Sequence, residues 1–430
     1  MSVLLYRAFV WFLAPLMLLL LLLRGLRDRS GPIDIAARFG YGRKLAGERI
    51  WLHAVSVGEV QAAQPLIKEL LRRQQSVAIT LTCTTPTGMQ RAQALFGDTL
   101  DLRYLPLDLP TAVRRFLERV RPRYGVILET EIWPNLYMAC AARGIPLFIV
   151  NARLSARSLR RMRRFPALLR ATLSGDVQVA AQSAADRQRF CELGFAATAV
   201  TEIGNIKFDI EVSEDHLRAA GELRERYGSL QKFVWVAAST HDGEEEIALQ
   251  AHRSLQRNGL QTQLIIAPRH PRRFDEVAAK LQQSGLRWQR WSALDAAAPS
   301  IDCDVLLLDT LGQLQAHYAM ADVAFVGGSL VPVGGHNLLE PVAFGVATLS
   351  GPHVFNAAEV ASKLITAGAV TIITDAASLS AELQQLAIDP LSRASRGTAG
   401  LRELASSRGT VSRLLDWLAA RIVSAARPLS

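Results

Sequence analysis

Apolar runs of strand length alternate with stretches of helical periodicity from about Arg49 onward. In one such stretch, Val113, Phe116, Leu117 and Val120 stand at i, i+3, i+4 and i+7, the spacing of one helix face. The strand-like runs of the first half cover residues 50–53, 77–82, 126–129, 147–151 and 177–181. After Asp209 the pattern starts again, with runs at 233–238, 264–267, 305–308, 323–326 and 347–349. Two successive βα series predict an α/β chain with two doubly wound, Rossmann-like domains.

A short polar segment at residues 210–215 separates the two series and marks the predicted domain boundary. We therefore expect an N-terminal segment at 1–29, a first domain at 30–210 and a second domain at 211–430. A length of 430 residues agrees with this, because a domain holds roughly 150 residues. The last helical stretch has one apolar face that can pack on either domain, formed by Val411, Leu414, Leu415, Leu418 and Ile422.

Residues 3–23 form an almost wholly apolar N-terminal stretch in which Arg7 is the one charge. About 20 such residues span a bilayer. The arginines that follow directly are Arg24, Arg27 and Arg29. They favour a cytoplasmic location for the rest of the chain, and they stand where a cleaved signal peptide would need small residues. The sequence therefore predicts an uncleaved membrane anchor, although Pro15 and Arg7 leave a shallow, monotopic insertion open.

The formal net charge of +10 favours anionic partners, such as phosphorylated ligands, nucleic acid or an acidic membrane surface. A solvated basic surface beside an anionic membrane accounts for the charge equally well. None of the four cysteines lies in a C-x-x-C pair, so neither a disulfide framework nor a structural zinc site is expected. Composition thus points to an anionic ligand or surface without choosing one.

The polar residues that follow the strand-like runs are the candidates for a site, because open parallel sheets bind ligands beyond the carboxyl ends of their strands. Ser56 and Glu59 follow the first run across a short flexible turn that opens a helix. Glu59 is either a base that takes a proton from an acceptor hydroxyl or a first-turn carboxylate favoured by the helix dipole. Glu129 and Glu131 follow another run. If one of them is buried beside Glu59, the pKa of one carboxyl group of that pair would rise. In the alternative reading, one of the two acids caps the next helix.

Basic residues stand at two further strand ends of the first half. Arg153 and Arg157 open an arginine-dense stretch, and guanidinium groups suit phosphate oxygens. A solvated basic face is the alternative reading for most arginines of this stretch. Lys207 precedes the predicted boundary, where its charge would neutralise a leaving phosphate.

The second half carries a comparable set of strand-end residues. Ser239, Thr240 and His241 follow a run and open a helix whose free N–H groups suit an anion, although capping alone also selects Ser and Thr. Arg269 follows the next run, where it is placed to hold a phosphate. A later glycine-rich turn lets the backbone approach a ligand closely, and Glu340 on the helix beyond it would accept hydrogen bonds from ribose hydroxyls.

Asp302 and Asp304 form an Asp-x-Asp pair, the arrangement by which metal-dependent sugar transferases hold a divalent cation. The pair precedes the run at 305–308, whereas the ligand edge of a doubly wound sheet lies at the other end of that strand, near Asp309. We therefore expect no metal site at these two aspartates.

Taken in order, these segments resemble the Kdo transferases, which move the acidic eight-carbon sugar 3-deoxy-D-manno-octulosonic acid (Kdo) from CMP-Kdo to a lipid A precursor in lipopolysaccharide assembly. The resemblance includes His53-Ala54-Val55-Ser56-Val57-Gly58-Glu59 and Thr85-Pro86-Thr87-Gly88. It continues through residues 129–135, 151–157, 204–209, 239–245, 268–271, 309–313 and 327–340, and the N-terminal anchor also matches.

The resemblance implies a GT-B architecture, with the acceptor on the first Rossmann-like domain, CMP on the second and a cleft between them. It implies an inverting reaction without a bound metal or other cofactor, at the cytoplasmic face of the bacterial inner membrane. Glu59 would be the base, and Glu129 and Lys207 would assist the transition state. The residues that would contact CMP are Pro268, Arg269, Leu311, Gly312, Gln313, Asn337, Leu338, Leu339 and Glu340. The expected partners are CMP-Kdo, a phosphorylated and acylated glucosamine disaccharide and an anionic membrane surface, with no nucleic acid.

Two departures and two alternatives accompany the resemblance. The family usually has Met-Gly-Glu where this chain has Leu311-Gly312-Gln313, so any role of that carboxylate would be lost, and Leu338 replaces a residue that is often Pro. A GT-B-like sugar-nucleotide epimerase would share the paired domains and strand-end acids but would not need an anchor. A non-catalytic, membrane-tethered scaffold would bind CMP or its sugar ester without turnover.

Overall fold

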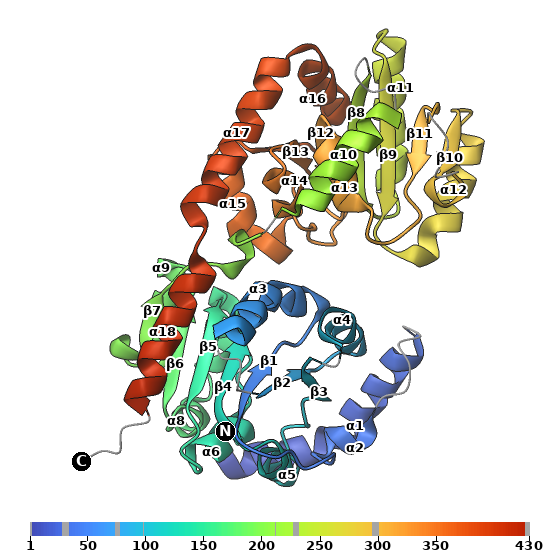
Figure 1. Ribbon diagram of the computed structural model, residues 1–430. Coiled ribbons are helices and arrows are strands. Elements are labelled where there is room, and N and C mark those ends of the chain that lie inside the picture. Colours follow the sequence, from blue (N-terminus) through green and yellow to red (C-terminus); the bar gives the residue numbers. More distant parts are fainter. Residues whose placement is uncertain are drawn as a thin grey trace. The chain divides into compact units, whose positions relative to one another are not determined.

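The computed structural model describes residues 2–27, 34–73, 78–97, 99–210, 212–226, 232–294 and 301–425 (Figure 1). The predicted positions of Arg29 and Val77 lie outside these ranges. The chain divides into two compact units, of which the first contains Met1–Asp209 together with Gly409–Ser430 and the second contains Ile210–Arg408. The range predicted for the second domain therefore differs at its end, because the last residues of the chain belong to the first unit.

The first unit is built on a seven-stranded sheet of order β3-β2-β1-β4-β5-β6-β7, in which all neighbouring strands are parallel. The strands are β1 (Arg49–His53), β2 (Ala78–Cys83), β3 (Asp101–Tyr104), β4 (Pro122–Leu128), β5 (Leu147–Ala152), β6 (Val177–Ala181) and β7 (Val200–Glu202). The strand order reverses between β1 and β4, and in doubly wound sheets such a switch point opens a crevice at the carboxyl ends of the strands.

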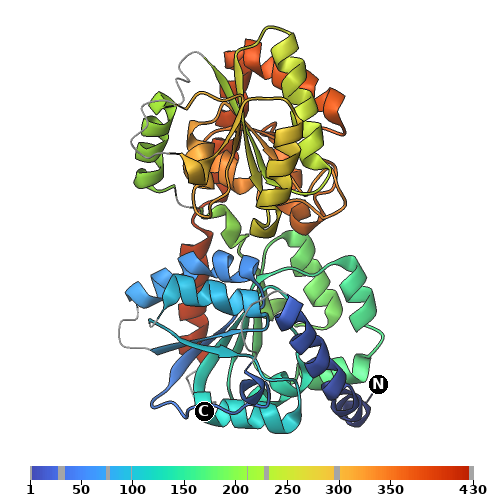
Figure 2. The same cartoon turned by 90° about the vertical axis from the view of Figure 1, so that its right-hand side faces the viewer.

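Helices cover both faces of this sheet, as Figure 2 shows. Ile50 and Leu52 of β1 pack into one buried cluster and Trp51 into the other, so both faces of the strand are apolar. The helices are α2 (Ile35–Arg38), α3 (Val57–Arg73), α4 (Pro86–Phe96), α5 (Pro110–Val120), α6 (Pro134–Ala141), α7 (Ala156–Met162), α8 (Pro166–Thr172), α9 (Ala184–Leu193), α18 (Thr410–Ala425) and the short 3-10 turns η1 (Ala197–Ala199) and η2 (Ile206–Phe208).

The N-terminal helix α1 (Val3–Arg27) packs one face on the first unit. Val10 and Ala14 are buried against Leu107, Leu109 and Ala112. Nearby, the Tyr6 hydroxyl donates to Asp108 Oδ2 at 2.7 Å, and Arg7 Nε donates to Asn135 Oδ1 at 3.1 Å. Over residues 3–20, most side chains outside this face are apolar and exposed, among them Leu4, Leu5, Phe9, Trp11, Phe12, Leu16, Leu19 and Leu20. By length and composition, the segment Val3–Leu20 is the one described helix able to cross a membrane, a test that a signal sequence also passes.

The C-terminal helix α18 completes the core of the first unit. Its face of Val411, Leu414 and Leu418 is buried in the cluster that also contains Ile50 and Leu66. At its start, Val411 N donates to Asp209 Oδ2 at 2.5 Å, and on its exposed side Arg73 pairs with Asp416 at 2.7 Å. These contacts make the C-terminal helix part of the first unit.

Leu414→Ala is therefore expected to destabilise the first unit by about 2–5 kcal/mol, because Leu414 is 1% exposed and its loss leaves a cavity. Urea unfolding of the full chain measures this. Asp416→Ala on the exposed side of the same helix is the control and should change the unfolding free energy by less than about 1 kcal/mol. Equal effects of the two substitutions would contradict the packing described.

The second unit holds another seven-stranded parallel sheet, of order β10-β11-β9-β8-β12-β13-β14. Its strands are β8 (Phe233–Thr240), β9 (Thr262–Pro268), β10 (Trp288–Arg290), β11 (Val305–Leu307), β12 (Val323–Val326), β13 (Ala347–Ser350) and β14 (Val370–Ile372). The strand order again reverses between two neighbours, here β8 and β12. The alternating residues of β8 enter two separate buried clusters, which places helices on both sheet faces.

The helices of the second unit follow the predicted βα alternation. They are α10 (Glu214–Arg226), α11 (Glu244–Arg257), α12 (Phe274–Gln283), α13 (Leu314–Met320), α14 (Leu339–Ala343), α15 (Ala358–Thr366), α16 (Ala376–Ile388), α17 (Pro390–Ser407) and the 3-10 turns η3 (Pro271–Arg273), η4 (Trp291–Ala293) and η5 (Phe355–Ala357). The prediction of two doubly wound α/β units is confirmed.

Candidate functional site

Glu59 lies at the switch point of the first sheet, on the first turn of α3 directly beyond β1. Its side chain folds back over the turn, where Oε2 accepts the Val55 N–H at 2.8 Å and Oε1 accepts the Ser56 hydroxyl at 3.1 Å. The carboxylate is therefore held at its own helix entry, in the first-turn position that the alternative reading of the sequence described. It is only half-buried, so capping does not remove it from contact with a ligand.

Two further carboxyl groups from the loop beyond β4 act on Glu59. Burial is the main influence and raises the pKa of Glu59 to about 7; the Val55 N–H opposes this, and the negative charges of Glu129 and Glu131 add to it. Burial likewise raises the pKa of Glu131 to about 6, with a contribution from Glu129. A carboxyl group with a pKa near neutrality is suited to take up and release a proton at physiological pH.

Glu129 forms an ion pair with Lys207, whose Nζ lies 3.0 Å from Glu129 Oε1. Both side chains are about one-third exposed, so the pair lies at the surface of the site. The backbone of Glu129 has a φ of 57°, a conformation that is unfavourable for residues other than glycine. Such strain persists where the surrounding structure imposes it and is frequent at functional sites.

Asn151, which precedes the end of β5, holds the loop that carries Lys207. Its side-chain oxygen accepts the Ile206 N–H at 3.1 Å, and its own φ is 51°. Gln182 donates to the Asn151 carbonyl at 2.8 Å and accepts from Asn205 at 3.1 Å, so three strand-end amides brace one another. Sequence reasoning gave no role to Asn151 or Gln182. The signal that was available is a side-chain amide at the end of an apolar run, as for Asn151, or directly after one, as for Gln182.

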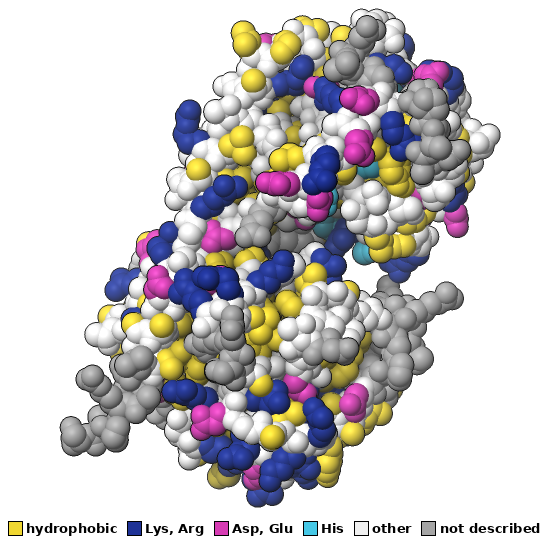
Figure 3. Space-filling view, viewed as in Figure 1, with side chains coloured by type: hydrophobic (Ala, Val, Ile, Leu, Met, Phe, Trp, Pro, Cys, Tyr) yellow, Lys and Arg dark blue, Asp and Glu magenta, His cyan; other side chains and the backbone are white. Residues whose placement is uncertain are grey.

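The two predicted arginines of the first unit differ in their placement. Arg153 follows β5 and is half-buried, and its carbonyl accepts a hydrogen bond from the Thr130 hydroxyl, which ties it to the Glu129 loop. Arg157 lies in the first turn of α7, and its side chain is exposed. Lys and Arg side chains are spread over the face seen in Figure 3 and do not form one patch, which agrees with a solvated basic surface for most of them.

In the second unit, the predicted Ser239, Thr240 and His241 lie at the end of β8. Ser239 has a positive φ of 53°. Thr240 is fully buried, and its hydroxyl donates to Glu245 Oε1 at 2.7 Å. That hydroxyl is turned into the unit, so the expected phosphate contact does not fit its position. His241 is half-exposed at the switch point beside β12.

A buried carboxylate holds this edge of the second sheet together. Glu244 is fully buried and accepts four backbone N–H groups at 2.7–3.0 Å. The donors are His241, Gly328, Ser329 and Leu330. The turns beyond β8 and β12 are thereby fixed to the start of α11. Glu245 beside it is neutralised by Arg273, at 2.6 Å.

The residues expected to contact CMP lie beyond the strand ends of the second unit. Pro268 is buried at the end of β9, and the exposed Arg269 follows it, with its N–H donating to the Thr240 carbonyl at 3.1 Å. Leu311 is 77% exposed, and Gly312 has a φ of 89°, in the turn that Gln313 ends as the N-cap of α13. Asn337 is exposed and Glu340 half-exposed, and they share a 3.1 Å hydrogen bond. Leu338 and Leu339 are buried, so their side chains are turned away from solvent.

Clustered acids in the second unit are already paired with basic side chains. Asp302 and Asp304 both contact Arg287 at 2.9 Å, at the start of β11 rather than at its carboxyl end. Asp242, Glu245 and Glu246 lie close enough together to bind an ion, but Lys280 contacts Asp242 at 2.6 Å and Glu246 at 2.7 Å. Lys280 and Arg273 thus balance the charge of these three carboxylates.

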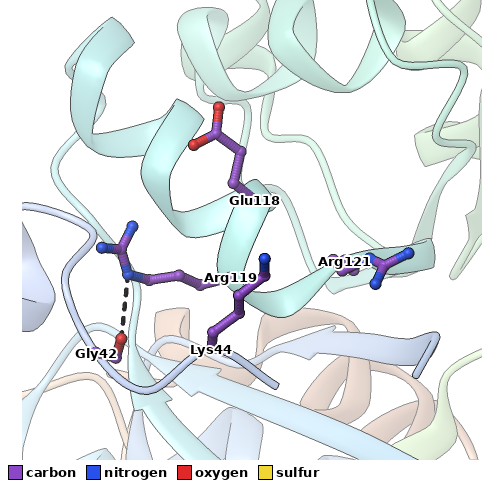
Figure 4. A pocket seen from close by; sticks show the side chains of 5 residues that line it. All are labelled: Gly42, Lys44, Glu118, Arg119 and Arg121. Carbon is purple, nitrogen blue, oxygen red and sulfur yellow. Dashed lines mark hydrogen bonds between the residues drawn. The ribbon is translucent and has the colours of Figure 1, made fainter. Parts of the chain in front are cut away.

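A basic pocket of about 630 Å³ lies in the first unit, lined by Gly42, Lys44, Glu118, Arg119 and Arg121 (Figure 4). Arg119 Nε donates to the Gly42 carbonyl at 3.1 Å. These residues come before β1 and around the end of α5, at the amino ends of the strands. The pocket is therefore on the edge of the sheet opposite to Glu59.

Comparison with known proteins agrees with this arrangement. Residues 34–210 match the family model described as 3-deoxy-D-manno-octulosonic-acid transferase (kdotransferase). The chain is 38% identical over 417 residues to the 3-deoxy-D-manno-octulosonic acid transferase of Haemophilus influenzae, covering 96% of this chain and 97% of the relative. It is 40% identical over 425 residues to the same enzyme of Bordetella pertussis, covering 94% and 96%.

The fold is also similar to a solved structure of UDP-GlcNAc 2-epimerase from Neisseria meningitidis bound to UDP-GlcNAc, with a TM-score of 0.56 and 15% identity over 86% of this chain and all of that one. At this identity the likeness establishes the GT-B type of fold alone. The two full-length relatives decide the family: the chain belongs to the 3-deoxy-D-manno-octulosonic acid transferases.

Proposed function

We propose that the chain transfers Kdo from CMP-Kdo to a lipid A precursor, with inversion and without a bound metal or cofactor. The observation that carries this proposal is Glu59, a carboxyl group with a pKa raised to about 7 at the switch point of the first sheet. The full-length relatives are named as transferases of this sugar, which identifies the group transferred. The acidic sugar and the phosphate of CMP-Kdo are anionic, and they suit the basic residues at the strand ends of the second unit.

In the proposed reaction, a hydroxyl oxygen of the acceptor attacks the anomeric carbon of Kdo. Its proton passes to Glu59, the bond from the anomeric carbon to the phosphate oxygen breaks, and CMP leaves with that electron pair. The proton on Glu59 then returns to solvent. Positive charge grows on the sugar ring and negative charge on the phosphate, so the carboxylate of Glu129 and the ammonium of Lys207 oppose the charges that develop.

Donor binding is assigned to the second unit. Arg269 is exposed at the end of β9 and offers a planar guanidinium to phosphate oxygens. The Leu311-Gly312-Gln313 turn and the backbone of Asn337–Glu340 would hold the nucleoside, and Glu340 would accept from ribose hydroxyls. Ser239 supplies a half-exposed hydroxyl at the same edge. CMP is a good leaving group. The residues named would stabilise the negative charge on its phosphate, which in other enzymes a bound metal ion stabilises.

The lipid acceptor accounts for the N-terminal helix. The exposed apolar face of α1 would enter the cytoplasmic leaflet of the inner membrane and keep the first unit beside its acylated substrate. Ser56, Arg153 and Arg157 are proposed contacts of the acceptor or its phosphates.

Incubation of the purified full chain with CMP-Kdo and a lipid A precursor, followed by mass spectrometry of the lipid, tests the proposal. A mass gain of one or more Kdo residues is expected, also in the presence of a chelator. Lipid of unchanged mass with bound CMP would indicate a scaffold, and an isomerised sugar nucleotide would indicate an epimerase. Either result would overturn the proposed transfer.

The rate of transfer is expected to rise with pH through about 7, because only deprotonated Glu59 accepts the proton and its pKa is raised to about 7. Glu131→Gln removes one negative charge that raises this pKa, so the rising limb should move to lower pH. Initial rates of transfer from pH 5 to 9 measure the limb. Glu118→Gln on the exposed side of α5 is the matched control, and a limb that stays in place in Glu131→Gln would refute the coupling.

A further inference from the structure

Three histidines follow three adjacent strands of the second sheet. His270 comes after β9, His241 after β8 and His336 in the loop beyond β12, and these strands are neighbours in the order β9-β8-β12. The switch point, where doubly wound sheets bind ligands, lies between β8 and β12 of this set. The proximity of these residues could not be predicted from the sequence, because His336 lies 95 positions after His241.

His241 and His336 are hydrogen-bonded to each other through their ring nitrogens. The two Nε2 atoms are 2.8 Å apart, and the rings are nearly parallel, at 7°. His270 approaches the His241 ring edge-on, with ring centroids 5.5 Å apart. A bond between two Nε2 atoms holds one proton, so one imidazole donates and the other accepts. The accepting ring, when neutral, carries its own proton on Nδ1.

The surrounding structure is built around this pair. A Cβ on Gly328 would lie 2.8 Å from His336 Nε2 and 3.4 Å from His241 Cδ2, so only glycine leaves room for both rings. The Gly335 N–H donates to the Gly328 carbonyl at 2.7 Å and closes the loop that carries His336. The buried carboxylate of Glu244 accepts the N–H groups of both His241 and Gly328. The pair is thus fixed from both strands before any ligand arrives.

Charges of both signs act on the pair: the carboxylates of Glu244 and Glu245 raise the pKa of His241, whereas Arg273 and Arg269 lower it. Arg269 acts on all three imidazoles, and in the described part of the chain no carboxylate forms an ion pair with it or with them. Burial, Arg269 and the other histidines lower the pKa of His336 to about 3. The pKa of His241 is lowered mainly by burial. The groups that act on His241 are Glu244, Glu245, Arg273 and Arg269, and those that act on His270 are His241, Arg269, Arg272 and Arg273.

We infer that the His241–His336 pair, flanked by His270 and Arg269, is an anion-binding site that takes up a proton from solvent when the anion binds. This inference rests on the proposed donor and deepens it: the ligand is an anionic group of a nucleoside monophosphate ester of an acidic sugar. Without a ligand, a further positive charge would be repelled by Arg269. With an anion in place, an additional proton taken up on Nδ1 of the donating ring makes that ring an imidazolium, and the pair gains a charge-assisted hydrogen bond without rearrangement.

The anion is either the phosphate or the sugar carboxylate, and calorimetric titrations of the full chain with cytidine, CMP and CMP-Kdo distinguish them. The variants are His336→Gln and His241→Gln, which keep a hydrogen-bonding amide but cannot take up the proton. A loss of roughly 10- to 100-fold in affinity is expected for the anionic ligands, with cytidine unaffected. Loss for both CMP and CMP-Kdo assigns the phosphate, and loss for CMP-Kdo alone assigns the carboxylate.

The number of protons taken up on ligand binding distinguishes the proposed role from a merely structural one. Loss of a purely structural contact would leave that number unchanged. Titrations at pH 7 in two buffers of different ionisation enthalpy should give more proton uptake for the wild-type chain than for His336→Gln. His216→Gln on α10 is the matched control and should equal the wild type. Gly328→Ala, which displaces the rings without removing them, should resemble His336→Gln.

The outcomes separate this inference from the function on which it rests. A wild-type chain that binds neither CMP nor CMP-Kdo would contradict the proposed donor. A wild-type chain that binds them, with unchanged affinity and unchanged proton uptake in both histidine variants, would overturn the anion site alone.

Discussion

Glu59→Gln is expected to lower kcat for Kdo transfer by roughly 100- to 10 000-fold, the range that a positioned general base contributes. The amide oxygen of Gln can still accept the Val55 N–H that Oε2 now binds at 2.8 Å, so the turn should keep its shape. The amide cannot accept the proton of the acceptor hydroxyl. Initial rates at saturating CMP-Kdo and lipid acceptor measure the loss.

Glu69→Gln is the matched control for this substitution. Glu69 lies on the same helix, but it is bound to Arg72 and Arg73 at the surface, so its replacement should leave kcat within about two-fold of the wild type. CMP affinity should be unchanged in both variants, because the proposed donor residues belong to the second unit. Near-normal transfer by Glu59→Gln would show that Glu59 is not the base of the reaction.

Glu244→Ala is expected to destabilise the second unit by at least about 4 kcal/mol. The substitution leaves four backbone N–H groups without the acceptor that they now share, and each unsatisfied buried donor costs about 1–3 kcal/mol. The turns beyond β8 and β12 should loosen as a result. Thermal and urea unfolding, with CMP titration of the folded variant, measure both consequences.

Glu246→Ala is the control for the buried carboxylate. Glu246 is exposed on the same helix and pairs with Lys280 at 2.7 Å, so its loss should change stability by less than about 1 kcal/mol. A Glu244→Ala chain as stable as Glu246→Ala would show that water replaces the four hydrogen bonds without loss.

The interior of the fold was predictable because central parallel strands are apolar on both faces. The predicted runs overlap β1, β2, β4, β5 and β6 of the first sheet and β8, β9, β11, β12 and β13 of the second. The missed strands β3, β7, β10 and β14 are the two edges of each sheet. β3 reads Asp-Leu-Arg-Tyr and is only partly buried. An edge strand pairs on one side and tolerates polar residues, so its sequence lacks a continuous apolar run.

The position of the candidate site was predictable because the sequence shows where apolar strands end. That reasoning located Glu59, Glu129 and Arg269, but it could not tell which way a side chain turns. Thr240 points into the core, where Glu245 accepts its hydroxyl. Glu244 had no predicted role, because three of its four N–H partners lie about 85 residues further along the chain. Contacts of this kind depend on the strand order, which periodicity does not specify.

The anomeric configuration of the transferred Kdo is the measurement that tests the central claim most directly. A direct displacement assisted by Glu59 forms one bond as the other breaks, so NMR of the lipid product should show the configuration opposite to that of CMP-Kdo. Retention would require another course, such as a second displacement through a covalent intermediate or attack from the face that CMP leaves. A product with retained configuration would therefore contradict the assignment of Glu59 as the base of a single displacement.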